Sequence, residues 1–146
     1  MKGVTRWLSS IGGKINEDGN VITQLAGIQK HALNVIHYDY LLTDRTVLDA
    51  YAYSVYLFQH DTINAAGFEE IGEIYRRYVK AYDHIFYFSP EFDIVLDGTR
   101  STQISFRDEV KHIFDNLINK DGLYNIVPVT GTVEERLELI LDVMKG

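Results

Sequence analysis

The chain contains no cysteine among its 146 residues. Disulfides and thiolate zinc sites are therefore excluded, and the absence is typical of proteins from the reducing cytoplasm, where we expect this one to reside. None of the five histidines stands at metal-ligand spacing from another, and no H-E-x-x-H sequence occurs. We therefore predict no metal site formed by the protein, and structural or surface roles for the histidines.

Long apolar runs and an excess of positive charge are also missing. No segment approaches the roughly 20 apolar residues of a membrane span, and the N-terminus has no run of signal-peptide length. The net charge of −7 and the pI near 5.1 disfavour a surface that coats nucleic acid, because counterion release needs clustered Lys and Arg. We expect neither a membrane nor a nucleic-acid partner. A small phosphorylated ligand can still bind in a local basic pocket.

The composition is that of an ordinary globular protein, with 46% hydrophobic and 24% charged residues. No repeat or linker divides the chain, so residues 1–146 are expected to form a single domain. Apolar residues recur at three- and four-residue steps in several segments, which is typical of amphipathic helices. The helices predicted in this way lie around Val4–Leu8, Val21–Val35, Leu48–Phe58, Phe68–Tyr78, Phe106–Leu117 and Thr132–Leu141.

Three short apolar runs predict strands, at Tyr38–Thr43, Ile85–Phe88 and Tyr124–Val129. Two of them read as continuous rather than alternating, as strands buried on both faces do. Pro128 places the third at an edge or a strand end, because proline has no N–H for the ladder. Strands that alternate with helices predict an α/β fold, with a parallel sheet and covering helices.

Asp44 and Arg45 follow the first predicted strand, where ligands collect in open α/β sheets. Asp44 could accept a proton and Arg45 could clamp a phosphate, while a second carboxylate, Asp49, lies on the next helical turn. The alternative is a surface ion pair at a strand–helix junction. Thr46 and Asp49 also have the spacing of a capping box. Both interpretations stay open at this point.

Two further segments contain candidate ligand-binding residues. Arg100 and Arg107 could grip one polyphosphate, from a loop and from the helix that follows it. The alternative is that Arg107 pairs with acidic neighbours on a solvated helix face. The segment Thr130-Gly131-Thr132 follows the third predicted strand, where glycine lets the backbone approach a ligand. Its alternative is an ordinary turn that leads into a capped helix.

Taken together, these segments resemble the P-loop kinase-like ATPases of the nicotinamide-riboside-kinase and thymidylate-kinase type. They are most similar to the small AAA-type ATPase/kinase domain family. The stretches that carry the resemblance are Ile15–Gly19 with Thr23-Gln24, Thr43–Tyr53, Tyr82–Tyr87, Asp97–Ser101, Phe106–Glu109 and Val129–Arg136. The resemblance implies a three-layer P-loop NTPase-like sheet with helices on both faces, and ATP and Mg²⁺ as the cofactors of the intact family.

The resemblance also implies a role for each candidate residue. Asp44 and Arg45 would be catalytic and face the phosphoryl acceptor, and Asp49 and Tyr53 would bind the substrate. The remaining assignments are Arg100 and Arg107 in a lid over the phosphates and Thr130, Gly131 and Thr132 beside the adenine. The partner would be a small nucleotide- or nucleoside-like ligand.

One element of that family does not occur in the sequence. The family opens with a strand and a G-x-x-x-x-G-K-[ST] loop that holds the nucleotide phosphates. Gly12-Gly13-Lys14 lacks the first glycine and the Ser or Thr after the lysine. We therefore expect a fold without its first strand and helix, a segment of about 30 residues, and no tight binding of ATP or Mg²⁺.

Two interpretations of the function follow, and a third is weaker. The chain is either part of a truncated nucleotide-dependent kinase or ATPase, inactive in this form, or a non-catalytic binding or assembly module derived from that fold. A carboxylate hydrolase that uses Asp44 and Asp49 would need a metal site that the sequence does not supply. Strand edges left open by the missing segment predict a possible homo-oligomer.

Overall fold

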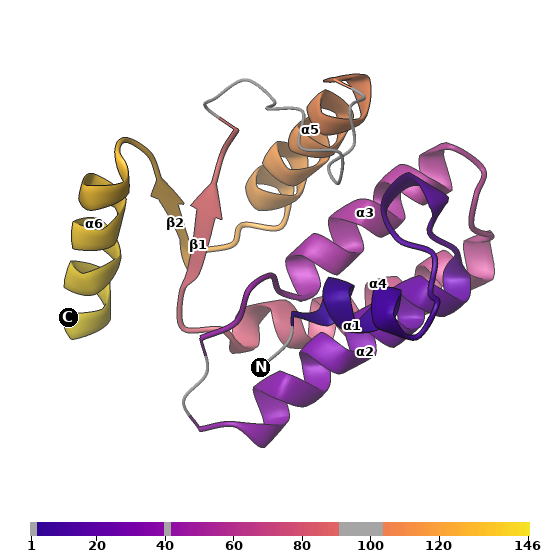
Figure 1. Cartoon of the computed structure of the whole chain (residues 1–146), viewed down its shortest axis with the longest axis horizontal. Coiled ribbons are helices and arrows are strands. Elements are labelled where there is room, and N and C mark those ends of the chain that lie inside the picture. The colour runs from indigo at the N-terminus through magenta and orange to yellow at the C-terminus, as the bar shows by residue number, and fades with distance from the viewer. Residues whose placement is uncertain (1–2, 40–41, 91–103) are drawn as a thin grey trace.

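The computed structural model describes residues 3–39, 42–90 and 104–146, and it is an α/β structure (Figure 1). Two short 3₁₀ turns, at Asn16–Asp18 and Val79–Ala81, interrupt the order of helices and strands. The elements in chain order are α1 (Val4–Ser10), α2 (Val21–His37), α3 (Val47–Gln59), α4 (Ala65–Tyr78), β1 (Ile85–Phe88), α5 (Ile104–Lys120), β2 (Ile126–Val129) and α6 (Val133–Lys145). All six helices expected from the apolar spacing are confirmed.

Reciprocal capping boxes start three of the helices. In each box the side chain of the N-cap residue accepts from a backbone N–H of the first turn, and the third helical residue bonds back to the N-cap N–H. The pairs are Asn20 with Thr23, Thr46 with Asp49, and Thr132 with Glu135. The start of the last helix at Thr132, predicted from its spacing to Glu135, is therefore confirmed.

The two strands β1 and β2 form a parallel pair in register from Ile85 opposite Ile126 to Phe88 opposite Val129. The strand predicted at Ile85–Phe88 has these same bounds. The strand predicted from residue 124 begins two residues later, at Ile126, and the Asn125 side chain before it bonds to the segment that precedes β1. Its Nδ2 donates to the carbonyl oxygens of Val79 and Tyr82 at 3.3 and 2.8 Å.

The strand predicted at Tyr38–Thr43 is wrong for the residues that the structure describes. Residues 38, 39, 42 and 43 connect α2 to α3 without strand pairing, and residues 40–41 lie outside the described residues. Tyr38 is 40% exposed and Leu42 is 79% exposed, so this apolar run is not enclosed between two layers. Asp44 and Arg45 therefore follow a loop. The described sheet has two strands, so the expected three layers are not confirmed.

The main core lies among α2, α3, α4 and α5, which together with α1 we call the helical body. Ile28, Leu48, Leu57 and Ile71 each expose 1% of their surface or less. The remaining elements, β1, β2 and α6, form what we call the sheet end, which extends from one side of the helical body in Figure 1. None of the thirteen residues of α6 is buried. The candidate site lies in the helical body.

Candidate functional site

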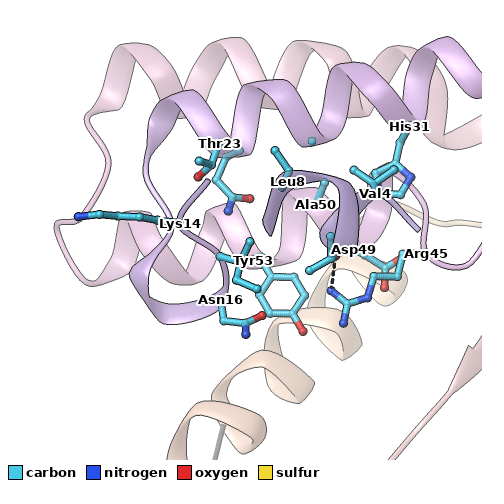
Figure 2. A pocket seen from close by; sticks show the side chains of 14 residues that line it. Val4, Leu8, Lys14, Asn16, Thr23, His31, Arg45, Asp49, Ala50 and Tyr53 are labelled. Atoms are coloured by element: carbon cyan, nitrogen blue, oxygen red, sulfur yellow. Dashed lines mark hydrogen bonds between the residues drawn. The ribbon is translucent and has the colours of Figure 1, made fainter. Parts of the chain in front are cut away.

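A pocket opens beneath α1, between α2 and the beginning of α3 (Figure 2). Its lining includes Arg45, Asp49 and Tyr53, three of the residues that the sequence singled out. Counted with its open mouth, the hollow contains about 450 Å³ of empty space. The part that the centre of a water molecule can occupy measures only about 50 Å³. We refer to this feature as the α1 pocket.

Arg45 crosses the pocket and contacts two of its walls. Its Nη1 donates to Thr5 Oγ1 of α1 at 3.1 Å, the dashed line in Figure 2, and its Cζ lies 5.6 Å from the centre of the Tyr53 ring. The second contact has cation–π geometry. Arg45 has a φ of +72°, in the left-handed region that costs a non-glycine residue about 1 kcal/mol or more. The Thr43 hydroxyl donates to the Arg45 carbonyl at 3.1 Å and supports this turn.

Asp49 combines a capping role with a place in the pocket lining. Its Oδ2 accepts from the Thr46 backbone N–H at 2.7 Å and from the Thr46 hydroxyl at 3.1 Å. Burial raises the pKa of the Asp49 carboxyl, while the hydrogen bonds from Thr46 and the charge of Arg45 act in the opposite direction. The capping box that the sequence spacing allowed is thus formed. Asp49 nevertheless also lines the α1 pocket.

His31 is a pocket residue to which the sequence analysis gave only a structural or surface role. It is 4% exposed, and burial followed by the charge of Arg45 lowers its pKa to about 4, against a smaller opposing effect of Asp44. The imidazole is therefore neutral near pH 7. Its Nδ1 is buried without a hydrogen-bond partner among the described residues. Buried polar atoms are rarely left unpaired, so this nitrogen is available to a bound ligand or water. The signal in the sequence was its position between Ile28 and Ala32, on the buried face of α2.

Other candidates lie outside the α1 pocket. Asp44 is exposed and does not line it, although its charge is felt by His31. Arg107 lies on α5, where its Nε contacts Asp108 at 3.3 Å. Arg100 lies outside the described residues. The structure thus unites Arg45, Asp49 and Tyr53, and it does not add Asp44 or Arg107 to their pocket.

The segment Thr130-Gly131-Thr132 lies in the sheet end. It forms the turn from β2 to α6, with Gly131 at a φ of +93° and Thr132 as the N-cap. This geometry agrees with the alternative interpretation, a turn that leads into a capped helix. A contact of these residues with adenine stays a prediction.

Gly12-Gly13 ends a helix and does not cradle a phosphate. Gly12 has a φ of +79°, and the Gly13 N–H donates to the Leu8 carbonyl at 2.9 Å, so the pair closes the C-terminus of α1. Lys14 follows, and in Figure 2 its side chain points away from Arg45 and Asp49. The part of the chain with described coordinates has no group of three or more acidic or histidine side chains that could hold a metal ion. Within the same residues, no helix has the length and apolar character needed to cross a membrane.

Comparison with known proteins gives one match. No curated protein and no solved structure matches the chain. A family model described as an AAA domain matches residues 22–136, well over half of the chain, and includes most of the residues that line the α1 pocket, both strands and the first turn of α6. The chain therefore belongs to the AAA-domain family of P-loop NTPase-like domains, a family of nucleotide-binding ATPases.

Proposed function

We propose that this chain forms the acceptor-binding part of a nucleotide-dependent kinase- or ATPase-like fold. In this proposal the α1 pocket binds a small nucleoside- or nucleotide-like acceptor. The observation that carries it is the convergence of Arg45, Asp49 and Tyr53 in one pocket with the unpaired Nδ1 of His31. A cation, a carboxyl group, an aromatic ring and a neutral imidazole match the phosphate, hydroxyl and ring groups of such a ligand.

Each side chain has a distinct role in this proposal. Arg45 has five N–H donors and gives one of them to Thr5, so others can bind a phosphate or hydroxyl oxygen. Tyr53 offers a ring face for stacking, and Asp49 accepts a hydrogen bond from a ligand hydroxyl. Asp44 is exposed near the pocket and would accept the proton of the attacking hydroxyl, as a general base does.

The nucleotide half of the proposal concerns residues outside the α1 pocket. Arg107 of α5, together with Arg100, would act as a lid over the phosphates, and Thr130–Thr132 in the sheet end would border the adenine. Residues 1–146 contain no G-x-x-x-x-G-K-[ST] sequence, whose amides and lysine stabilise the transferred phosphoryl group. We therefore propose that residues 1–146 alone bind ATP and Mg²⁺ weakly and do not turn ATP over.

The test is a titration followed by NMR chemical shifts and calorimetry, with adenosine, AMP, inorganic phosphate and ATP with Mg²⁺. We expect binding in the high-micromolar range or weaker, which a few charge-assisted contacts can give. Arg45→Ala should weaken AMP binding about tenfold or more. Arg76→Ala is the matched control, because Arg76 is an exposed arginine of α4 that contacts Glu69 at 2.7 Å.

Equal affinities in wild type and Arg45→Ala would contradict the proposal and place any binding elsewhere. A magnesium-dependent ATPase rate that disappears in Asp44→Asn would contradict the proposed inactivity of residues 1–146. The two results are separate, because the first concerns the acceptor pocket and the second concerns turnover.

A second candidate is a non-catalytic assembly module that forms a homo-oligomer. The observation that favours it is the exposure of apolar side chains along α6, where Val133, Leu137 and Met144 are 75, 55 and 50% exposed. Two copies that bury this face together would form a closed symmetric dimer, the commonest oligomer. Sedimentation equilibrium showing only a 16.8 kDa species at tens of micromolar would contradict this candidate.

A further inference from the structure

The segment of residues 3–16, which we call the cap, precedes the residues that the family model matches. The family match begins at residue 22, so the cap and the turn after it lie outside the match. Nevertheless the cap supplies a large share of the pocket lining. The residues that it contributes are Val4, Thr5, Leu8, Lys14, Ile15 and Asn16. A segment outside the matched domain thus covers a pocket that lies mostly inside it.

The pocket beneath the cap is too small for the ligand that its chemistry suits. Its water-accessible space of about 50 Å³ compares with roughly 30 Å³ per molecule in liquid water and roughly 300 Å³ or more for a small-molecule pocket. The closed pocket therefore holds water but not a nucleoside. For a ligand of that size to reach Arg45 and Asp49, α1 has to move away from α2.

Few contacts hold the cap in place. Val4 and Leu8 are buried against α2, where Gly27 leaves room for them. A Cβ atom at residue 27 would lie 3.3 Å from Leu8 Cδ1 and 3.9 Å from Val4 Cγ1. The hydrogen bond from Arg45 to Thr5 joins the cap to the beginning of α3. Segments held by so few buried apolar side chains open at lower free energy than the core of a domain.

Two consecutive glycines follow the C-terminal end of α1. Gly12, in the left-handed region, and Gly13 separate α1 from the turn at Asn16–Asp18. Hinges are a few loop residues that absorb large changes in φ and ψ, which glycine does without steric penalty. Trp7, the only tryptophan of the chain, lies within α1, before these glycines. The Nζ of Lys30 on α2 lies 5.9 Å from the centre of its ring.

We propose that the cap opens about Gly12-Gly13 to admit the acceptor, and that in the closed state Thr5 competes with the acceptor for the Arg45 guanidinium. The ligand part of this inference rests on the function proposed above. When only the open state binds, the apparent affinity is reduced by the fraction of molecules that are open. Changes that weaken the closed state therefore strengthen ligand binding, whereas loss of a simple pocket wall would weaken it.

The first experiment measures amide hydrogen exchange without ligand, in wild type and Gly27→Ala. The added methyl group presses on Leu8, so the Trp7 and Gly13 amides should exchange about fivefold faster or more, while amides of α3 and α4 keep their rates. Gly72→Ala is the matched control. It adds the same methyl group to a glycine within helix α4, where the nearest atom is the mobile end of Arg76 at 2.9 Å.

Unchanged exchange rates at Trp7 and Gly13 would contradict the proposed opening of the cap. An equal acceleration throughout α3 and α4 would also contradict it, because α1 would then open only when the whole domain unfolds. This experiment needs no ligand, so its outcome does not depend on the proposed function.

The second experiment titrates wild type, Thr5→Val and Thr62→Val with adenosine, followed by the fluorescence of Trp7. Thr5→Val removes the hydroxyl that holds Arg45 and should strengthen binding about three- to tenfold. Thr62→Val is the control, because the Thr62 hydroxyl donates to the His60 carbonyl at 3.4 Å, on an exposed turn away from the cap. Trp7 should become more accessible to acrylamide as adenosine binds.

Equal or weaker binding by Thr5→Val would overturn the competition between Thr5 and the ligand. If adenosine binds to none of the three proteins while Gly27→Ala accelerates exchange in the cap, the opening of the cap is supported and adenosine is excluded as the acceptor. If adenosine binds and the accessibility of Trp7 does not change, the result supports the acceptor pocket and contradicts the proposed opening of the cap.

Discussion

The helical body and the sheet end are packed in very different ways. In the helical body, Ile28, Leu57 and Ile71 are completely buried, whereas α6 in the sheet end has no buried residue. The sheet end is joined to the helical body partly by polar contacts, such as those of the Asn125 side chain, which precedes β2 and donates to the carbonyl oxygens of Val79 and Tyr82. The α1 pocket thus lies in the region that contains the main core, whereas Thr130–Thr132, the predicted adenine contacts, lie in the sheet end.

The largest expected change in stability comes from a substitution in the core of the helical body. Leu57 on α3 is fully buried, so Leu57→Ala should lower the free energy of unfolding by about 2–5 kcal/mol, through lost apolar contact and the cavity that remains. Urea unfolding followed by circular dichroism measures it. A loss below about 1 kcal/mol would mean that this core is not what stabilises the domain.

Acid sensitivity should also originate in the helical body, at His31. Its pKa is about 4 in the folded chain and 6.5 in the unfolded one, so the unfolded state takes up the proton first. The stabilisation that neutral His31 contributes is fully present above pH 6.5, and it is lost as the pH falls from 6.5 towards 4. The raised pKa of Asp49 acts in the opposite direction, because the folded state then binds a proton more readily.

We therefore expect wild type to lose about 3 kcal/mol more than His31→Gln between pH 7 and pH 4. The comparison of the two proteins separates His31 from Asp49 and the exposed carboxylates, which both proteins retain. Urea unfolding at the two pH values provides the measurement. Parallel pH profiles would show that His31 is not the acid-sensitive group.

Two capping boxes compare the regions directly. Thr46 caps α3 in the helical body and Thr132 caps α6 in the sheet end, each with an acidic partner three residues later. Thr46→Ala should reduce the stability by about 1–2 kcal/mol. Thr132→Ala should reduce it by less than about 0.5 kcal/mol, because α6 can fray without unfolding the core. Equal losses would contradict the division into two regions.

The smallest effect is expected on the outer face of α6. Leu137 is 55% exposed, so Leu137→Ala should change the free energy of unfolding by no more than about 0.5 kcal/mol. The matched comparison is Leu57→Ala, the same substitution in a fully buried position. A large loss that grows with protein concentration would instead favour the homo-oligomer, since α6 would then be covered by a second copy.

The parts of the fold that the sequence predicted are those determined by local signals. Helix α6 begins after its N-cap Thr132 because a capping box needs only two residues three positions apart, and β1 has the predicted bounds because Pro90 follows its apolar run. The run at Tyr38–Thr43 was misread as a strand. Most of its residues are apolar or aromatic, but Leu42 is mostly exposed, and only the tertiary structure decides whether such a run is covered.

The same distinction applies to the site. Arg45, Asp49 and Tyr53 follow one another at four-residue steps, so one helix face and the turn before it bring them together. Thr5 and His31 reach the pocket from α1 and α2, and no local spacing connects them with Arg45. The Thr5 hydroxyl lies 40 positions from Arg45 in the chain, so this contact became visible only in the structure.

Pro128 has a consequence for how the sheet can grow. The Ile85 N–H donates to the Asn125 carbonyl, and in a parallel ladder this register turns the backbone groups of residues 126 and 128 away from β1. Residue 128 is a proline and has no N–H, so Ile126 has the only outward donor among the four residues of β2. A strand that added to this side would find no donor at residue 128, and the missing hydrogen bond disfavours growth of the sheet at this edge.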